Sequence, residues 1–392
     1  MRAETMRAKK PRAKGKTLNK INSNLKSGDF LLMLFTVILV IFGLIMVFSA
    51  SYYYSISWTG SAYGYLKRHG IWVILGFIAM IFGASFDYRR YRKIAVPILI
   101  ISVVLLILIF TPLGQNVNGA TRWLKLGPIT IMPGELAKLA AIIFIARFLS
   151  DKPERIKSIT QGILPCVVVA GVLGVLIIKQ PNLSTAITVV GIILAMMLVA
   201  GMKWRYVIGA GSVGIAGILS IILFMKDSYW YQRLAIVLDP FQDPLGDGYQ
   251  VVQSLLALGS GGLFGVGLGK SVQKNLYLPE PQNDFILAII GEELGFIGVL
   301  ALIVLYCLLL WRGAHIAMNA PDQFGMMLAS GIVLMIAIQV ILNIAVVTST
   351  MPPTGINLPF ISYGGNALLI FMFSAGVLLN ISRHGPKNTG AN

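Results

Sequence analysis

The chain consists mostly of long apolar runs separated by shorter polar stretches. About ten runs are long enough to cross a bilayer as a helix, which takes about 20 residues. They are apolar on all sides and lack the two-residue alternation of barrel strands. We therefore predict an all-α, polytopic integral membrane protein. The predicted helices lie near residues 30–54, 70–86, 94–110, 133–149, 159–178, 184–201, 205–225, 284–311, 324–347 and 362–382.

Two connections are much longer than the joining of two helices requires. Residues 226–283 form a large predicted outer loop between the seventh and eighth helices, and residues 111–138 contain a second outer segment. Long loops of this kind often carry function. The predicted organisation is a basic tail over 1–28, a ten-helix membrane domain over 29–383 and a tail over 384–392. We expect no cleaved signal peptide, because a full-length apolar run follows the long basic tail.

Composition and charge agree with a membrane protein. Apolar residues make up 56% of the chain and charged residues 12%, and the mean hydropathy is +0.80. With both termini in the cytoplasm, 22 of the 32 Lys and Arg residues lie inside, as the positive-inside rule requires. Only six of the 15 acidic residues lie there, so nearly all of the net charge of +17 marks orientation. We expect contact with anionic lipid and no nucleic-acid partner.

The residue types exclude several kinds of site. Cys166 and Cys307 lie in separate apolar runs, and the three histidines are isolated. A transition-metal site built from His and Cys is therefore not expected. The glycine-rich stretch 259–269 contains no GxGxxG pattern, and the chain contains no P-loop. We expect no nucleotide cofactor.

Candidate chemistry appears first between the third and fourth predicted helices. Arg122 and Trp123 lie where the chain meets the membrane surface, although Trp123 could equally be an interfacial anchor. Pro133 suits the first turn of a helix, which places Glu135 and Lys138 on one face. Ionisable groups at membrane depth are costly and indicate function, with a mutual structural ion pair as the alternative.

The eighth predicted helix opens with Asp284, which suits either a helix cap or a general base. Glu292 and Glu293 lie about two turns deeper, and at least one must face the bundle interior. The last outer connection, residues 351–365, has no charge but three prolines and three glycines, which indicates a groove wall. The residues thus predict an acid–base site at the outer face, for an amphiphilic and anionic substrate.

Five motifs in order resemble the SEDS family of shape, elongation, division and sporulation proteins, which includes FtsW and RodA. The resemblance covers about residues 30–382. The stretch S-x-Q-K-x-x-Y-L-P-E is closer to the division protein FtsW and the sporulation branch than to the rod-elongation branch. The motifs are NGATRWLKLGPITIMPGELAK, KQPNLSTA, DPLGDGYQVVQSLLALGSGGLFGVGLG, SVQKNLYLPEPQNDFILAIIGEELG and NLPFISYGGNALL.

The resemblance implies a peptidoglycan glycosyltransferase. Such an enzyme polymerises lipid II, an undecaprenyl-diphosphate-linked substrate, outside the cytoplasmic membrane, here during septal cell-wall synthesis. The family's essential aspartate maps onto Asp284, the implied general base, and its motif lysine onto Lys138. Implied partners are a class B penicillin-binding protein, which is a transpeptidase, and other division proteins. Further implied substrate-binding residues are Arg122, Trp123, Glu135 and Glu280.

The leaving diphosphate needs positive charge in the transition state. Lys138, Arg122, Lys270 and Lys274 are the candidate donors of that charge. A divalent cation, Mg²⁺ or Mn²⁺, could assist, because Mg²⁺ binds phosphates and usually lacks a dedicated protein cage.

The chain departs from the family's usual residues at several motif positions, which leaves the roles of those positions open. They are Met132, Asn182, Ser184, Gln282 and Asn283.

Two other functions compete with the polymerase. One is a lipid II flippase, and the other is a non-catalytic scaffold that holds a transpeptidase. A flippase should also present a polar site to the inner leaflet. The predicted inner loops are short and carry little but positive charge, which favours the polymerase.

Overall fold

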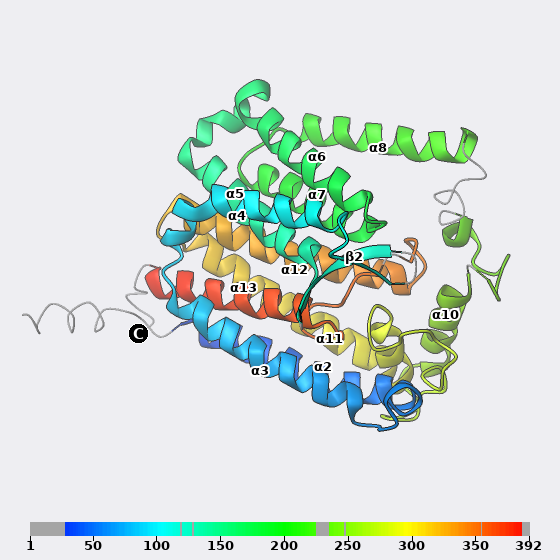
Figure 1. Cartoon of the computed structure of the whole chain (residues 1–392). Coiled ribbons are helices and arrows are strands. Elements are labelled where there is room, and N and C mark those ends of the chain that lie inside the picture. The colour runs from blue at the N-terminus through cyan, green and yellow to red at the C-terminus, as the bar shows by residue number, and fades with distance from the viewer. Residues whose placement is uncertain are drawn as a thin grey trace, which may run out of the picture.

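The computed structural model describes residues 28–117, 120–127, 129–224, 235–246, 248–353 and 355–385. Within these ranges it is a bundle of long helices (Figure 1). The predicted tails over 1–28 and 384–392 lie almost entirely outside the described residues, as do residues 226–234 of the large loop.

The helices follow the ten predicted apolar runs. Both ends of α2 show why it begins and ends where it does, because Asp29 accepts a hydrogen bond from the Leu32 N–H and Gly60 is left-handed. The helices are α2 (Phe30–Thr59), α3 (Gly64–Ser85), α4 (Arg89–Leu108), α5 (Pro133–Asp151), α6 (Leu164–Ile178), α7 (Leu183–Val199), α8 (Trp204–Phe224), α11 (Ile286–Met318), α12 (Gln323–Val347) and α13 (Gly365–His384).

Seven of the described helical segments are long and apolar enough to cross a membrane by length and composition alone. The remaining predicted spans correspond to α5, α7 and α8. α7 has only 17 residues, and α5 carries the charged residues Glu135, Lys138, Arg147 and Asp151. The fold is therefore that of a multi-pass membrane protein, as the hydrophobic pattern predicts.

The first membrane helix, α2, begins at the end of the bundle where the last one, α13, ends. The Asp29 N–H donates to the Ser382 hydroxyl over 3.0 Å, and Arg312 forms an ion pair with Asp29. Figure 1 shows this end on the left, next to the end of α13, with α10 (Tyr249–Gly261) at the far right. An even number of crossings predicts this arrangement.

A small antiparallel sheet, which the sequence analysis did not predict, lies in the connection between α4 and α5. It consists of β1 (Gly114–Val117), β2 (Ala120–Leu126) and β3 (Ile129–Ile131) in that order. The side chain of Leu124 on β2 is fully buried. The Asn366 amide donates to the Thr130 carbonyl over 3.2 Å, which ties the sheet to the start of α13.

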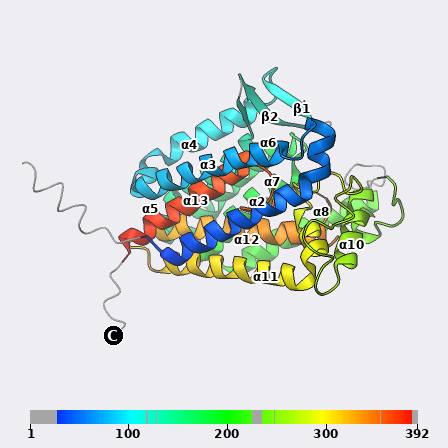
Figure 2. The same cartoon turned by 90° about the horizontal axis from the view of Figure 1, so that it is seen from below.

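Close packing of α13 against α3 positions one wall of the bundle (Figure 2). A Cβ at Gly376 would lie 2.1 Å from the Met80 carbonyl oxygen, so only glycine allows this approach. α12 lies in the middle of the bundle and contacts α5, α7 and α11.

α11 is broken at Gly295, whose φ of 69° is left-handed. The segment Ile286–Leu294 therefore takes its own direction before the long membrane helix continues. The chain just after α10 fills the break. Phe296 and Ile297 donate their N–H groups to the carbonyls of Gly262 and Leu263, over 2.9 and 3.1 Å.

Candidate active site

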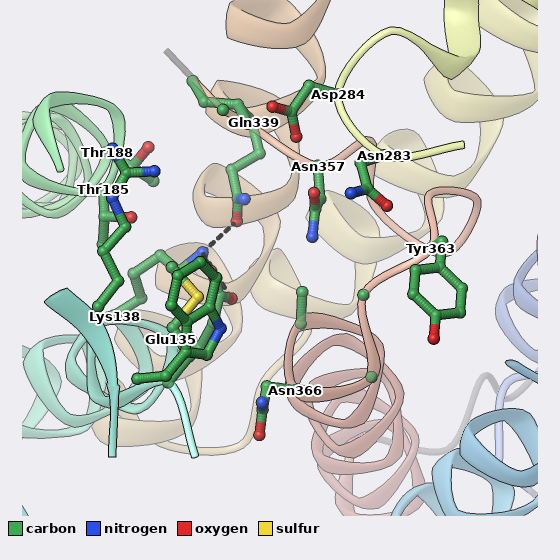
Figure 3. A pocket seen from close by; sticks show the side chains of 18 of the residues that line it. Glu135, Lys138, Thr185, Thr188, Asn283, Asp284, Gln339, Asn357, Tyr363 and Asn366 are labelled. Atoms are coloured by element: carbon green, nitrogen blue, oxygen red, sulfur yellow. Dashed lines mark hydrogen bonds and ion pairs between the residues drawn. The ribbon is translucent and has the colours of Figure 1, made fainter. Parts of the chain in front are cut away.

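A polar cavity of about 300 Å³ lies where the sheet, the loop before α11 and the starts of α5, α7 and α13 meet (Figure 3). Six separate segments of the sequence contribute to its walls. The lining residues are Arg122, Trp123, Met132, Glu135, Lys138, Thr185, Thr188, Glu280, Asn283, Asp284, Gln339, Gly355, Ile356, Asn357, Tyr363, Gly364, Gly365, Asn366 and Ala367.

Lys138 and Glu135 form a buried ion pair in one wall. The Lys138 Nζ lies 2.7 Å from the Glu135 carboxylate, and the two side chains are 1% and 8% exposed. Pro133 opens α5 and sets the first turn from which both residues project. Lys138 also donates to the Gln339 Oε1 over 3.1 Å, as Figure 3 shows. The ion pair that the sequence offered as the alternative to a functional role is thus present, and it faces the cavity.

Arg122 on β2 lies near Asp284 at another wall. Its guanidinium donates to the carbonyl of Pro181, just before α7. A Cβ at Gly355 would lie 3.3 Å from the Asp284 Oδ2 and 3.6 Å from the Arg122 Nη1. Both charged groups therefore border the same glycine, whose φ of 78° is left-handed. The last outer connection forms a wall here, as its composition predicts.

The Asp284 carboxyl is tuned by its surroundings. It lies just outside the membrane-spanning part of α11 and is partly buried in the cavity wall. The pKa of Asp284 is raised to about 7, mainly by burial and also by the charge of Glu280, while the charge of Arg122 opposes the rise. A carboxyl with this pKa exchanges its proton near neutral pH, as a general base must.

The main chain at Asp284 is fixed by a residue that the sequence analysis missed. The side-chain amide of Asn343, which is fully buried on α12, donates to the Asp284 carbonyl over 2.8 Å. It also donates to the Ile356 carbonyl over 2.7 Å. Asn343 thus joins the two loops that form the cavity. Gln339 lies one turn earlier, and these two buried amides in an apolar helix were a signal available in the sequence.

Six of the predicted site residues line the cavity together: Asp284, Lys138, Arg122, Trp123, Glu135 and Glu280. The structure does not bring Lys270 or Lys274 to it. The Lys270 side chain is exposed. The Lys274 ammonium is bound instead to Glu293, 2.7 Å away, because a buried carboxylate attracts the nearest cation. Glu292 and Glu293 are both buried, as the sequence requires of at least one.

The cavity contains the carboxylates of Glu135, Glu280 and Asp284. Among the described residues, no group of three or more His, Cys, Asp or Glu side chains is placed to hold a metal ion. Asp284 and Glu280 could supply one or two oxygen ligands, which fits a cation that is bound mainly by substrate phosphates.

The fold and the cavity together define a multi-pass membrane protein with an acid–base site near one end of its bundle. The model of the FtsW/RodA/SpoVE family, described as cell cycle protein, matches residues 29–387. The chain therefore belongs to this family.

Similar relatives agree with this assignment. Stage V sporulation protein E of Bacillus subtilis is 43% identical over 359 residues, which cover 91% of this chain and 98% of that protein. The probable peptidoglycan glycosyltransferase FtsW of Geobacter metallireducens is 40% identical, over 90% of this chain and 94% of that protein. Both match the division and sporulation branch that the sequence indicates.

Solved structures share the fold. A chain from work on the structural coordination of polymerization and crosslinking by a peptidoglycan synthase complex has a TM-score of 0.76 and 27% identity. The match covers 91% of this chain and 98% of that chain. The rod shape determining protein RodA of Thermus thermophilus has a TM-score of 0.68 and 26% identity, over 92% and 99% of the two chains.

Proposed function

We propose that this chain is a peptidoglycan glycosyltransferase that polymerises lipid II at the outer face of the cytoplasmic membrane, with Asp284 as general base. The observation that carries the proposal is the position of Asp284. Its carboxyl, with a pKa near 7, lies in a polar cavity that also contains Arg122 and the Lys138–Glu135 pair.

In the proposed reaction, the Asp284 carboxylate removes the proton from the 4-hydroxyl of the acceptor sugar. The oxygen then attacks the anomeric carbon of the donor, and a new glycosidic bond forms. The bond between that carbon and the diphosphate oxygen breaks, and undecaprenyl diphosphate leaves with the bonding electrons. Asp284 holds the proton until it passes to solvent.

Arg122 and Lys138 are the cations that line the cavity, so they supply the charge that stabilises the leaving diphosphate. Lys138 can keep its contact with Glu135 and turn one of its other N–H donors toward an anion. A bound Mg²⁺ or Mn²⁺ would neutralise part of the diphosphate charge. Trp123 gives the cavity an aromatic face on which a sugar can pack.

The same family assignment supports a partner and a location. We expect a class B penicillin-binding protein to crosslink the strands that this chain makes, together with other division proteins at the septum. The charge asymmetry supports cytoplasmic termini. With that orientation the cavity opens at the outer leaflet, where we expect lipid II to be consumed.

The test is a polymerisation assay with the purified protein, its transpeptidase partner and lipid II, in which glycan strands are resolved on a gel. We expect Asp284→Asn to lower the rate by about 10² to 10⁴-fold. An Asp284→Asn protein as fast as wild type would remove Asp284 from this role. The exposed Lys157→Met variant is the matched control, because its ion pair with Glu154 is at the surface.

The flippase alternative makes a different prediction in the same preparation. A flippase would move labelled lipid II between the leaflets of a vesicle without making strands, and a scaffold would do neither. Ion pairs such as Arg312–Asp29 and Arg89–Asp322 occupy the opposite end of the bundle, which favours a site open to one leaflet.

A further inference from the structure

Lys274 and Glu293, which lie ten residues before and nine residues after Asp284, form a buried ion pair outside the cavity. Lys274 and Glu293 are 3% and 0% exposed, and the Lys274 Nζ lies 2.7 Å from the Glu293 Oε1. The Ser49 hydroxyl on α2 donates to the Glu293 carboxylate over 2.7 Å and accepts from Lys274 over 3.1 Å. This three-residue cluster joins the loop, the first part of α11 and α2.

A second buried contact lies directly beside the first. The Glu292 carboxylate, 1% exposed, accepts hydrogen bonds from the Ser271 hydroxyl and from the Val272 N–H, the latter over 2.7 Å. Residues 271–274 are thereby bound to residues 292–293. The chain between them forms a closed loop, whose ends are fixed by side chains that do not touch the cavity.

Main-chain hydrogen bonds also stabilise this junction. We call the contacts of residues 266–267 and 271–274 with residues 292–293 the neck of the loop. The N–H groups of Val266 and Gly267 donate to the carbonyls of Glu292 and Glu293, over 2.9 and 3.0 Å. These carbonyls lie just before the break at Gly295 and lack their usual helical partners. The neck therefore sits where α11 changes direction.

The loop above the neck is strained. Leu276 and Glu280 are not glycine, yet their φ angles of 68° and 47° are left-handed. Such a conformation is unfavourable for a residue with a Cβ and persists only where its surroundings hold it. Asn283 donates to the Glu280 carboxylate over 2.7 Å, so the strained Glu280 is linked to the residue next to Asp284.

We propose that Lys274, Glu293 and Glu292 are positioning residues, which keep this loop closed so that Asp284 and Glu280 stay at the cavity wall. The proposal rests on the proposed function for its effect on catalysis, whereas the closing of the loop can be measured without catalysis. The cluster accounts for Lys274, Glu292 and Glu293, none of which lines the cavity.

A misplaced base is costly, because a displacement of about 1 Å can lower a rate by about 10²-fold. We expect Lys274→Met to lower kcat by about that factor and to change KM by less than about threefold, since Lys274 does not line the cavity. We also expect the acid limb of the pH–rate profile to move to lower pH, because an opened loop exposes Asp284 to water.

Amide hydrogen exchange tests the loop itself and needs no turnover. In the full-length protein, Lys274→Met should speed exchange of a peptide over 275–285 by at least about tenfold. The matched control is Lys157→Met, which breaks an exposed ion pair of 2.9 Å and should leave this peptide and the rate unchanged. If wild type makes no strands, the proposed function fails while the exchange result still decides whether the neck closes the loop.

Two double variants separate positioning from folding stability. Lys274→Glu with Glu293→Lys keeps a buried pair beside Ser49, and should recover at least about tenfold of the lost kcat. Lys274→Met with Glu293→Leu replaces the pair with apolar groups, which often restores folding. We expect this protein to fold, to remain slow and to exchange fast over 275–285.

The proposal would be overturned if the folded double variant Lys274→Met with Glu293→Leu had the kcat, pH profile and exchange rates of wild type. The charged neck would then be dispensable. If Lys274→Met does not fold, Lys274→Arg and the two double variants decide between the same outcomes.

Discussion

The acid limb of the pH–rate profile is the sharpest measure of the proposed site, and Glu280→Gln is the change that tests it. The carboxylate of Glu280 raises the pKa of Asp284, while burial is the larger cause. Removing the Glu280 charge therefore lowers the pKa of Asp284 and leaves burial in place. Because only the ionised base accepts a proton, the profile should move to lower pH.

The magnitude follows from the pKa of about 7. At pH 6 a base with this pKa is about one-tenth ionised, so wild type should run at about a tenth of its plateau rate. We expect Glu280→Gln to lower the midpoint by about one pH unit. At pH 6 the variant should then reach about half of its own plateau. Arg122 opposes the raised pKa, so Arg122→Gln should move the midpoint upward.

The assay is the initial rate of strand formation from labelled lipid II between pH 5 and 9, with each variant normalised to its own plateau. Normalisation removes any loss of substrate binding, which we expect for Arg122→Gln. Residual activity of Asp284→Asn should show no limb near pH 7. Midpoints that stay fixed in both variants, or move in the same direction, would refute Asp284 as the titrating base.

The structure yields three further predictions. Lys138→Met leaves the buried Glu135 carboxylate without its cation. The free energy of unfolding, measured by thermal unfolding in detergent, should therefore fall by about 3 to 5 kcal/mol, and adding Glu135→Gln should recover most of this loss. Gly355→Ala should reduce strand formation at least about tenfold, because the added Cβ would crowd the general base. Gly60→Ala is the control, since Gly60 has a φ of 69° but open space around it. This variant should lose about 1 kcal/mol of folding stability and no activity. Asn343→Leu removes the hydrogen-bond donors of the Asp284 and Ile356 carbonyls. We expect a lower kcat for strand formation, and a loss of about 1 to 3 kcal/mol in the free energy of unfolding, measured by thermal unfolding.

The end of the bundle opposite the cavity offers a contrast in electrostatics. Burial alone would raise the pKa of Asp322, but hydrogen bonds from the Tyr88 hydroxyl and the Gly325 N–H, with Arg89 nearby, lower it. The ionised form of Asp322 is thus held by three donors. At the cavity the balance is reversed, because burial and the like charge of Glu280 together outweigh Arg122, so the pKa of Asp284 stays raised. The first arrangement suits a structural cap, and the second suits a base.

The hydrophobic pattern determined the helices, because each crossing must bury about 20 apolar residues whatever its neighbours are. The even number of predicted crossings placed both ends of the domain together, and the contact between Asp29 and Ser382 agrees. The pattern did not reveal the sheet between α4 and α5, because its strands of four, seven and three residues are too short to show a clear two-residue period.

The site was predicted only in part, for a physical reason. Lys138 and Glu135 were visible because a charge at membrane depth is costly and stands out in an apolar sequence. Asp284 was visible because it opens the eighth predicted helix and matches the family's essential aspartate. Lys274 was an equal candidate for the cavity, but in the folded chain its ammonium binds Glu293 instead. One sequence cannot say which of several buried carboxylates a lysine will meet, because that depends on how distant helices pack.

The membrane class, the number of apolar segments and the residue types available for acid–base chemistry can therefore be read from the order of the residues. Which of these residues share a cavity depends on how the folded chain packs. It placed Arg122 and Asp284 around Gly355, and it fixed the main chain of Asp284 through Asn343 on another helix. Local composition sets the cost of burying a charge, whereas its partner and its pKa depend on groups far away in the sequence.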